Sequence, residues 1–328
     1  MKDLRQLLFE SCNIMARFSD RCSQSPVTQD SPISYSNNTP CCGWYHGAWQ
    51  YLRILNCVSS PQWHEEFYKQ SFKTAFSNKR KIRILICGTA DYSLLYLLTT
   101  VLLEHKIEAK IDILDICITP LRICEWFVNN CDSETNNNYQ LLNESKEYNR
   151  KLIFNDKILV ETFKKDIKTF YPADGDGIYD IICSDAFLTR FSITDINIVL
   201  DRWAKLLVTG GRIITTVRLY ENVDHCSKQS LSKISVNFNK YCSKVMERYE
   251  QLSKEEKLKM NLTAEDLRFV SFRYIERMTS NPLGNKENID ELFKKSKLSV
   301  TNTESNYCAR VDGEIAETFY YQIVAKKR

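Results

Sequence analysis

Three aspartates of this chain each follow a short apolar segment, at positions where carboxylates could bind a nucleoside. Asp115 ends the apolar segment that comes after the Gly88 turn, and Asp166 and Asp185 follow the next two. A carboxylate at the end of the second strand of a parallel sheet can accept both ribose hydroxyls. Asp166 is then placed to take an adenine amino group. A helix cap or a strand-end turn is the alternative role for each aspartate.

The turn Gly88-Thr89-Ala90-Asp91 resembles a phosphate-binding loop but keeps only one glycine. A diphosphate is held by a glycine-rich turn whose backbone approaches the phosphates closely. Neither a full G-x-G-x-x-G pattern nor a P-loop lysine is present. The turn therefore favours a nucleoside ligand without phosphates.

Short apolar runs alternate with helical patterns from Lys81 onward, which predicts a parallel sheet covered by helices on both faces. The predicted strands are 82–87, 110–115, 158–163, 178–183, 211–217, about 298–303 and 318–325. The predicted helices between them are roughly 91–104, 119–130, 194–207 and 287–295. Ligands of such sheets bind outside the carboxyl ends of the strands, where the turn and the three aspartates lie.

The expected fold is α/β, with a doubly wound, mostly parallel seven-stranded sheet whose last strand is antiparallel. N-terminal helices and a helical insertion add to it. Residues 131–150 are Asn-rich and are expected to form a loop and a frayed helix. The expected organisation is an N-terminal helical or lid segment 1–78, a core 79–220, a helical insertion 221–285 that covers the substrate, and a C-terminal segment 286–328 that completes the sheet.

An aromatic helix follows the Ser/Pro/Asn-rich loop 21–42 and could cover the site. Trp44, Tyr45 and Trp49 flank His46 in sequence, so they could stack on a cationic substrate while His46 acts in catalysis. Core packing is the alternative for these aromatic residues.

Three charged residues complete the candidate site. Asp185 is a candidate catalytic residue that could hold an ammonium group or accept a proton. Arg190 and Arg218 could pair with a substrate carboxylate, or be surface or structural charges.

Composition excludes several classes of function. A net charge of +4 from 45 basic and 41 acidic residues disfavours nucleic-acid binding. Thirteen cysteines are an odd number with no metal-like spacing, which favours a reducing cytoplasm and no metal site. No apolar stretch approaches the ~20 residues that span a bilayer, so no membrane partner is expected.

Residues 81–219 resemble a class I S-adenosylmethionine-dependent methyltransferase. The matching pieces are "ILICGTADYS", "IDILDICITPL", "KKDIKTF", "YDIICSDAFLTRF" and "LLVTGGRIITTVRL", and "ELFKKSKLSV" and "FYYQIVAKK" are similar to the last helix and strand pair. The resemblance implies S-adenosylmethionine (SAM) as cofactor, held by Gly88, Thr89, Ala90, Asp91, Asp115, Ile116, Asp166, Ile167 and Ser184.

The glycine motif departs from the family pattern at three positions. Ile86 stands where the family has an acidic residue, and Ala90 and Tyr92 replace the second and third glycines. Asp91, Ser93 or an N-terminal residue is therefore expected to hold the methionine end of the cofactor.

The predicted function is methyl transfer to a small molecule, with an amine favoured over a hydroxyl as acceptor. An RNA or protein methyltransferase and a non-catalytic adenosyl-binding protein are the alternatives. The long insertion could also form a homodimer interface.

Overall fold

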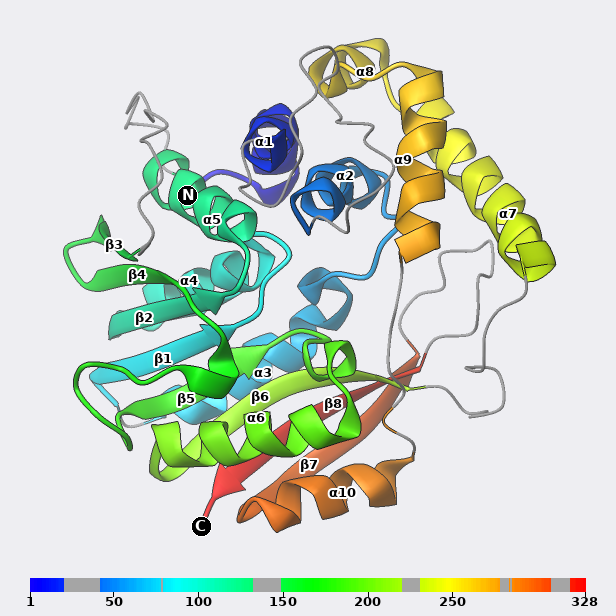
Figure 1. The fold of residues 1–328 in the computed structure, drawn as a ribbon. Coiled ribbons are helices and arrows are strands. Elements are labelled where there is room, and N and C mark those ends of the chain that lie inside the picture. The colour runs from blue at the N-terminus through cyan, green and yellow to red at the C-terminus, as the bar shows by residue number, and fades with distance from the viewer. Residues whose placement is uncertain are drawn as a thin grey trace.

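One mixed sheet forms the centre of the protein (Figure 1). The computed structural model describes the backbone of residues 1–20, 42–77, 79–131, 149–219, 231–277, 283, 285–307 and 319–328. The strand order is β3-β4-β2-β1-β5-β6-β8-β7. The strands are β1 (Lys81–Cys87), β2 (Glu108–Asp115), β3 (Asn149–Asn155), β4 (Ile158–Lys164), β5 (Tyr179–Ser184), β6 (Leu207–Leu219), β7 (Leu298–Tyr307) and β8 (Phe319–Lys327).

The α/β doubly wound prediction is confirmed. β1 pairs in parallel with β2 and β5, β2 with β4, and β5 with β6. β8 is antiparallel to β6 and β7, as expected for the last strand. Each predicted strand corresponds to an observed one, although the sheet has eight strands and not seven.

The additional strand is β3, which pairs antiparallel with β4 at the edge of the sheet. Its sequence lies at the end of the polar region expected to be a loop and a frayed helix, of which residues 132–148 are outside the described part. Leu152 and Phe154 pack against the core, whereas Ile153 between them is 75% exposed. This alternation, followed by the turn at Asn155-Asp156, is a hairpin signal that could have identified the strand.

Helices cover both faces of the sheet, as the alternating side chains of β1 require. Ile84 and Ile86 join one core with α3, α4 and α5, and Leu85 and Cys87 join a second core with α6 and α10. The helices of these layers are α3 (Glu65–Phe76), α4 (Ser93–Glu104), α5 (Ile118–Asn130), α6 (Ile193–Leu206) and α10 (Lys286–Lys295). The short 3-10 helices are η1 (Pro61–His64), η2 (Ile167–Thr169) and η3 (Leu188–Arg190).

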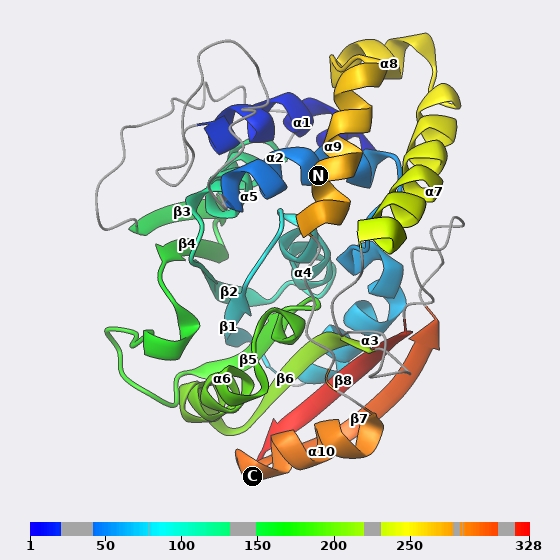
Figure 2. The same cartoon turned by 45° about the vertical axis from the view of Figure 1, so that its right-hand side comes forward.

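The N-terminal helices and the insertion together form a further layer above the sheet (Figures 1 and 2). It contains α1 (Leu4–Asp20), α2 (Cys42–Ile54), α7 (Leu231–Glu250), α8 (Lys254–Met260) and α9 (Ala264–Arg277). The ring of Tyr274 in α9 lies 6.1 Å from that of Trp49 in α2 and 5.7 Å from that of Tyr241 in α7. The Tyr241 hydroxyl donates to the Cys57 carbonyl at 2.8 Å. The N-terminal segment therefore shares its core with the rest of the molecule.

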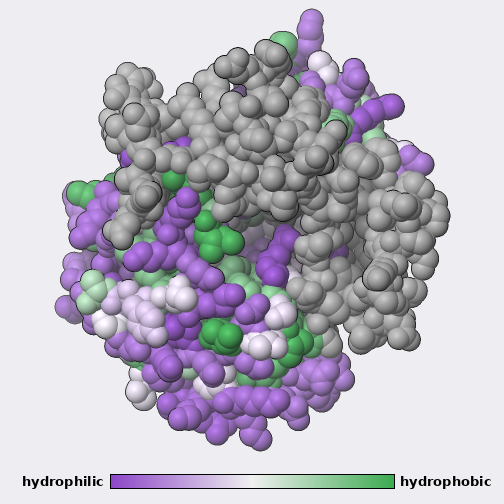
Figure 3. All heavy atoms as spheres, in the orientation of Figure 1, coloured by the Kyte–Doolittle hydropathy of each residue, from purple (hydrophilic) through white to green (hydrophobic). Residues whose placement is uncertain are grey.

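Hydrophilic side chains dominate the described surface around α6 and the neighbouring strands (Figure 3). Within the described ranges, no helix has both the length and the apolarity needed to cross a membrane.

Candidate cofactor and acceptor site

The strand order places a topological switch point at the carboxyl end of β1. β2 and β4 lie to one side of β1, and β5 and β6 lie to the other. Ligands of open α/β sheets bind where the direction of strand addition reverses, which here is between β1 and β5. The residues that follow β1, β2, β4 and β5 border this point, and the candidate site residues predicted from the strand ends are among them.

Gly88 begins the turn after β1 with a φ of +64°. Its N–H donates to the Leu114 carbonyl at 2.9 Å, which ties the turn to β2. A Cβ at Gly88 would collide with the ring of Phe187, the third residue after β5. Glycine is required here both for the left-handed backbone and for the close approach of that ring.

Asp115 is held against the same turn by backbone donors. Thr89 N–H donates to its Oδ2 at 3.0 Å, and Cys117 N–H donates to its Oδ1 at 2.7 Å. Burial raises the pKa of Asp115 to about 6, and these N–H donors oppose that shift only in part. The next side chain, Ile116, is 65% exposed. A half-buried carboxylate beside an exposed apolar side chain fits a ribose with an adenine face next to it.

Asp166 lies at the same edge of the sheet as Asp115. Lys165 N–H donates to the Asp115 carbonyl at 3.0 Å, so the chain after β4 passes directly beside Asp115. Asp166 also caps η2 by accepting from Lys168 N–H at 2.9 Å, and its side chain remains 39% exposed. Ile167 is 3% exposed, and its side chain packs in the core.

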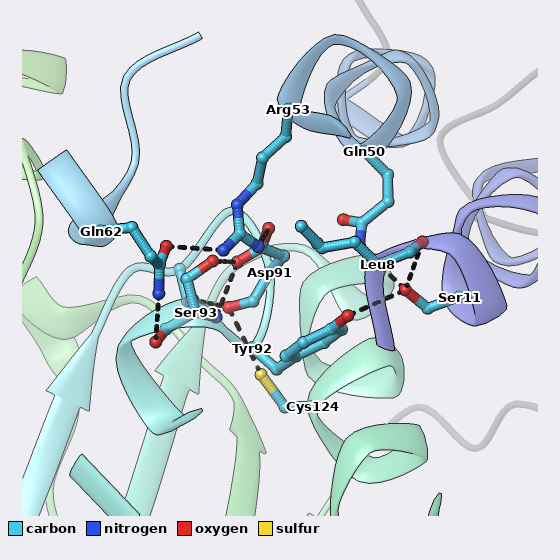
Figure 4. A network of polar contacts seen from close by, with 10 residues as sticks. Leu8, Ser11, Gln50, Arg53, Gln62, Asp91, Tyr92, Ser93 and Cys124 are labelled. Atoms are coloured by element: carbon cyan, nitrogen blue, oxygen red, sulfur yellow. Dashed lines mark hydrogen bonds and ion pairs between the residues drawn. The ribbon is translucent and has the colours of Figure 1, made fainter. Parts of the chain in front are cut away.

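Asp91 points into the protein, where it forms a buried network with α2 (Figure 4). Its carboxylate is paired with Arg53 and accepts hydrogen bonds from the backbone and hydroxyl of Ser93. Arg53 also donates to Gln62 Oε1 at 2.6 Å. The side chains of Arg53 and Asp91 are 4% and 2% exposed. Both oxygens of Asp91 are therefore already engaged by protein groups.

Tyr92 fills the space that a third glycine would leave open. Its ring is fully buried and lies 5.1 Å from that of Phe127, at an interplanar angle of 7°. Its hydroxyl is 3.0 Å from Ser11 Oγ in α1. Ala90 packs against the same core. The start of α4 is thus covered by side chains from α1 and α2, where a diphosphate would need free backbone N–H groups.

Asp185 follows β5 and is bound through one oxygen only. Its Oδ1 accepts from the hydroxyls of Tyr68 at 2.9 Å and Thr216 at 2.7 Å. Among the described residues, none donates to Oδ2. The alternative role, a cap for the next helical turn, is not what these contacts show. Ser184 lies behind it, fully buried, with Oγ 2.7 Å from Thr215 Oγ1.

Ala186 has a φ of +49°, in the left-handed region that non-glycine residues rarely adopt. Its N–H donates to Thr216 Oγ1 at 2.9 Å. The same threonine hydroxyl therefore fixes both the strained residue and Asp185. Such backbone strain is concentrated at functional sites.

His46 and the aromatic residues of α2 do not join this cluster through any described contact. His46 is 8% exposed, and Trp49 is 6% exposed with its ring against Tyr274. Trp49 is therefore a core residue, which is the alternative role for this helix. The side chains of Trp44 and Tyr45, and the loop 21–41, lie outside the described residues.

His64 is the histidine beside Asp185, and the sequence did not reveal it. Its ring lies 6.5 Å from that of Tyr68, and its Nδ1 is 3.2 Å from Gln322 Nε2. Burial lowers the pKa of His64, and the Asp185 charge opposes this shift. The tertiary pairing of η1 with β8 creates this position, so no local pattern announces it.

The two arginines lie on the β5 and β6 side of the switch point. Arg190 ends η3 and is exposed, and Arg218 lies on β6 opposite Tyr320 of β8. The described part of the chain contains no group of three or more His, Cys, Asp or Glu residues arranged to hold a metal ion.

Comparisons with known proteins find similarity of structure only. No family model and no curated protein matches the chain. A magnesium protoporphyrin IX methyltransferase from Synechocystis PCC 6803, solved with bound S-adenosylhomocysteine, is 9% identical, with 85% of this chain and 94% of that chain covered and a TM-score of 0.45. A SAM-dependent methyltransferase from Methanosarcina mazei is 12% identical, with 76% of this chain and 93% of that chain covered and a TM-score of 0.41. A [4+2]-cyclase is 9% identical, with 79% of this chain and 80% of that chain covered and a TM-score of 0.44.

Proposed function

We propose that this protein is a SAM-dependent methyltransferase that acts on a small molecule. The observation that carries the proposal is the Asp115 carboxylate, fixed to the Gly88-Thr89 turn at the switch point and followed by the exposed Ile116. Lone pairs of Asp115 remain for ribose hydroxyls after two backbone N–H groups have bonded to it. Asp166, beside it and half-exposed, is the candidate partner of the adenine.

A dinucleotide fits this site less well than SAM. Phosphates bind at a helix N-terminus with free N–H groups. The start of α4 is covered by Arg53, and Asp91 already accepts the Ser93 N–H at 2.7 Å. A cofactor without phosphates does not need these groups. When bound, SAM supplies an electrophilic methyl group on a positively charged sulfur.

The protein's own residues divide into a cofactor side and an acceptor side. Asp115 and Asp166 lie beyond β2 and β4, whereas Asp185 and Arg218 lie at β5 and β6, across β1. Methyl transfer needs alignment of the acceptor and a dry site more than it needs a strong base. Asp185 is proposed to bind the acceptor and to accept its proton, which favours an amine over a hydroxyl.

The proposal includes a reducing, cytoplasmic compartment. All eight cysteines whose side chains are described are free thiols in the protein interior. Free buried thiols of this kind are typical of proteins from reducing compartments.

Isothermal calorimetry with SAM and S-adenosylhomocysteine, and with NADH and ATP as comparison ligands, tests the proposal. Both adenosyl compounds should bind and the phosphorylated ligands should not. Asp115→Ala should lower the affinity for S-adenosylhomocysteine at least about tenfold, as expected when hydrogen bonds to a charged group are lost. Asp156→Ala, which removes an exposed aspartate of the β3–β4 turn, is the matched control. The absence of adenosyl binding to the wild-type protein would refute the proposal.

Transfer of a labelled methyl group to pools of amines and hydroxylated compounds would then identify the acceptor. Uptake by RNA or protein, with none by small molecules, would favour the alternative acceptor class. Binding of the cofactor without transfer to any acceptor would favour a non-catalytic adenosyl-binding protein.

A further inference from the structure

Asp185 is oriented by two side chains that come from different parts of the chain. Tyr68 belongs to α3 in the N-terminal segment, and Thr216 belongs to β6. Both donate to Oδ1 of Asp185, at 2.9 and 2.7 Å. Two donors on one oxygen fix the plane of the carboxylate, since a rotation would break both bonds.

The direction of these hydrogen bonds follows from chemistry. Thr216 Oγ1 accepts the Ala186 N–H, so its single proton is available for Asp185. The Tyr68 hydroxyl is fully buried and shares its proton between Asp185 Oδ1 and the Ser184 carbonyl, the latter at 2.8 Å. Burial and the Asp185 charge raise the pKa of Tyr68, so the phenol remains a donor.

The second oxygen of Asp185 has a different environment. No described residue donates to Oδ2, and the Asp185 residue is partly exposed. Tyr68, His64 and Tyr320 behind it are each no more than 2% exposed. A carboxylate that is hydrogen-bonded through one oxygen and partly exposed can pair with a cation through its other oxygen.

We propose that Tyr68 and Thr216 are positioning residues that hold Asp185 with Oδ2 directed at the methyl acceptor, and that the acceptor is a cationic amine. This inference rests on the proposed function. Before the transfer step, the bound ammonium gives one proton to Asp185 Oδ2, which passes it to water, so that the nitrogen regains its lone pair. This lone pair then forms the bond to the methyl carbon as the sulfur–carbon bond breaks, and the electron pair of the broken bond remains on sulfur.

The ligand pair sinefungin and S-adenosylhomocysteine tests this without knowledge of the acceptor. In sinefungin a carbon atom replaces the sulfur of SAM, and an amine on this carbon replaces the methyl group. Its ammonium group would therefore lie where the acceptor and the methyl group meet. Calorimetry should show that the wild-type protein binds sinefungin about tenfold more tightly than S-adenosylhomocysteine, the effect of one charge-assisted hydrogen bond. Asp185→Asn should remove this preference.

The positioning residues are tested by the ratio of the affinity for sinefungin to the affinity for S-adenosylhomocysteine. Tyr68→Phe and Thr216→Val should each reduce the preference for sinefungin several-fold, while the affinity for S-adenosylhomocysteine stays constant. Thr216→Ser keeps a hydroxyl and should restore the ratio. Thr215→Val removes a neighbouring buried hydroxyl that bonds Ser184 and not Asp185, so it should leave the ratio unchanged.

The outcomes separate the two proposals. If the wild-type protein binds neither ligand, the proposed function fails. If it binds both but shows no preference for sinefungin, or if Thr216→Val retains the full preference, the positioning inference is overturned and the proposed function stands. Should Tyr68→Phe fail to fold, the Thr216 pair of variants decides alone.

Discussion

Asp115 shows at the scale of one residue how burial and hydrogen bonding compete. Removal from water disfavours its ionised form, and the N–H donors of Cys117 and Thr89 favour it. Burial has the larger effect, so the pKa rises to about 6. The folded protein therefore binds this proton more tightly than the unfolded chain, whose aspartates titrate near ~3.9. The contribution of Asp115 to stability is greatest below about pH 4 and declines as the pH rises to about 6.

Cofactor affinity should have the opposite dependence on pH. Ribose hydroxyls donate hydrogen bonds, and the ionised carboxylate accepts them better than the protonated acid. The affinity for S-adenosylhomocysteine should therefore increase between pH 5 and pH 7, with a midpoint near the pKa of about 6. Calorimetry across this range checks the dependence.

The control for the pH series is Asp115→Asn, which cannot ionise. Its affinity should be lower and almost constant over the same range. A wild-type affinity that does not change with pH, or an equal change in the variant, would show that another group is responsible.

The element that distinguishes this site is α2, because Arg53 connects it to the turn after β1. Gln50 of the same helix donates to Ser11 Oγ at 2.9 Å, and that hydroxyl contacts Tyr92. The polar groups of α1, α2 and the turn form one network (Figure 4). The N-terminal helices therefore support the turn after β1 through this network. The sequence predicted a helical or lid segment in residues 1–78.

Loss of one partner from the buried Arg53–Asp91 pair should destabilise the protein strongly. Arg53→Met leaves the Asp91 carboxylate buried and uncompensated, and such changes cost about 3–5 kcal/mol. Urea unfolding gives the free energy. Lys69→Met is the matched control because the Lys69–Glu65 pair is 29% and 40% exposed, where a pair contributes about 0–1 kcal/mol.

The double variant Arg53→Met with Asp91→Asn separates pairing from packing. If the pair is coupled, the double variant should lose less free energy of unfolding than the sum of the two single variants. Additive losses, or a cost for Arg53→Met as small as that for Lys69→Met, would contradict the structural role of the network.

At the scale of the whole molecule, the covering of each strand by helices determines whether the sequence could predict it. Strands such as β1 are apolar on both faces because helices cover them, so their sequence is recognisable. β3 is an edge strand with one exposed face, and its short alternating sequence directly follows a polar, Asn-rich region, so the sequence analysis did not separate it from the predicted loop. The candidate site follows the same rule: the positions of Asp115, Asp166 and Asp185 at strand ends were predictable, whereas the positions of Tyr68 and His64 depend on how α3 and η1 pack against the sheet.

The part of one sheet face that lies over β2 and β4 has no crossover helix of its own, which accounts for the charges within these strands. Residues 165–178 between β4 and β5 form only the short η2. On that face Arg83 pairs with Asp112 at 3.1 Å, and Lys110 pairs with Glu161 at 3.0 Å. Burial raises the pKa of Asp112, and Tyr179 donates to it at 2.6 Å. The polar residues of 110–115 and 158–163 therefore replace the contacts that a helix would supply.

The buried thiols report the integrity of the whole fold. Burial raises the pKa of Cys12 and of Cys57 to about 12, and alkylation requires the thiolate. Iodoacetamide at pH 8 should therefore leave these two residues unmodified in the native protein and modify them in urea, as mass spectrometry of peptides would show. Modification of Cys12 or Cys57 in the native protein at the rate of a free thiol would contradict the observed packing of α1 and α2.

The most direct test of the central claim is a crystal structure with S-adenosylhomocysteine. The predicted complex has both ribose hydroxyls on the Asp115 carboxylate, the adenine beside Ile116 and Asp166, and the sulfur on the Asp185 side of β1. A ligand bound elsewhere, or a ribose without contact to Asp115, would contradict the claim.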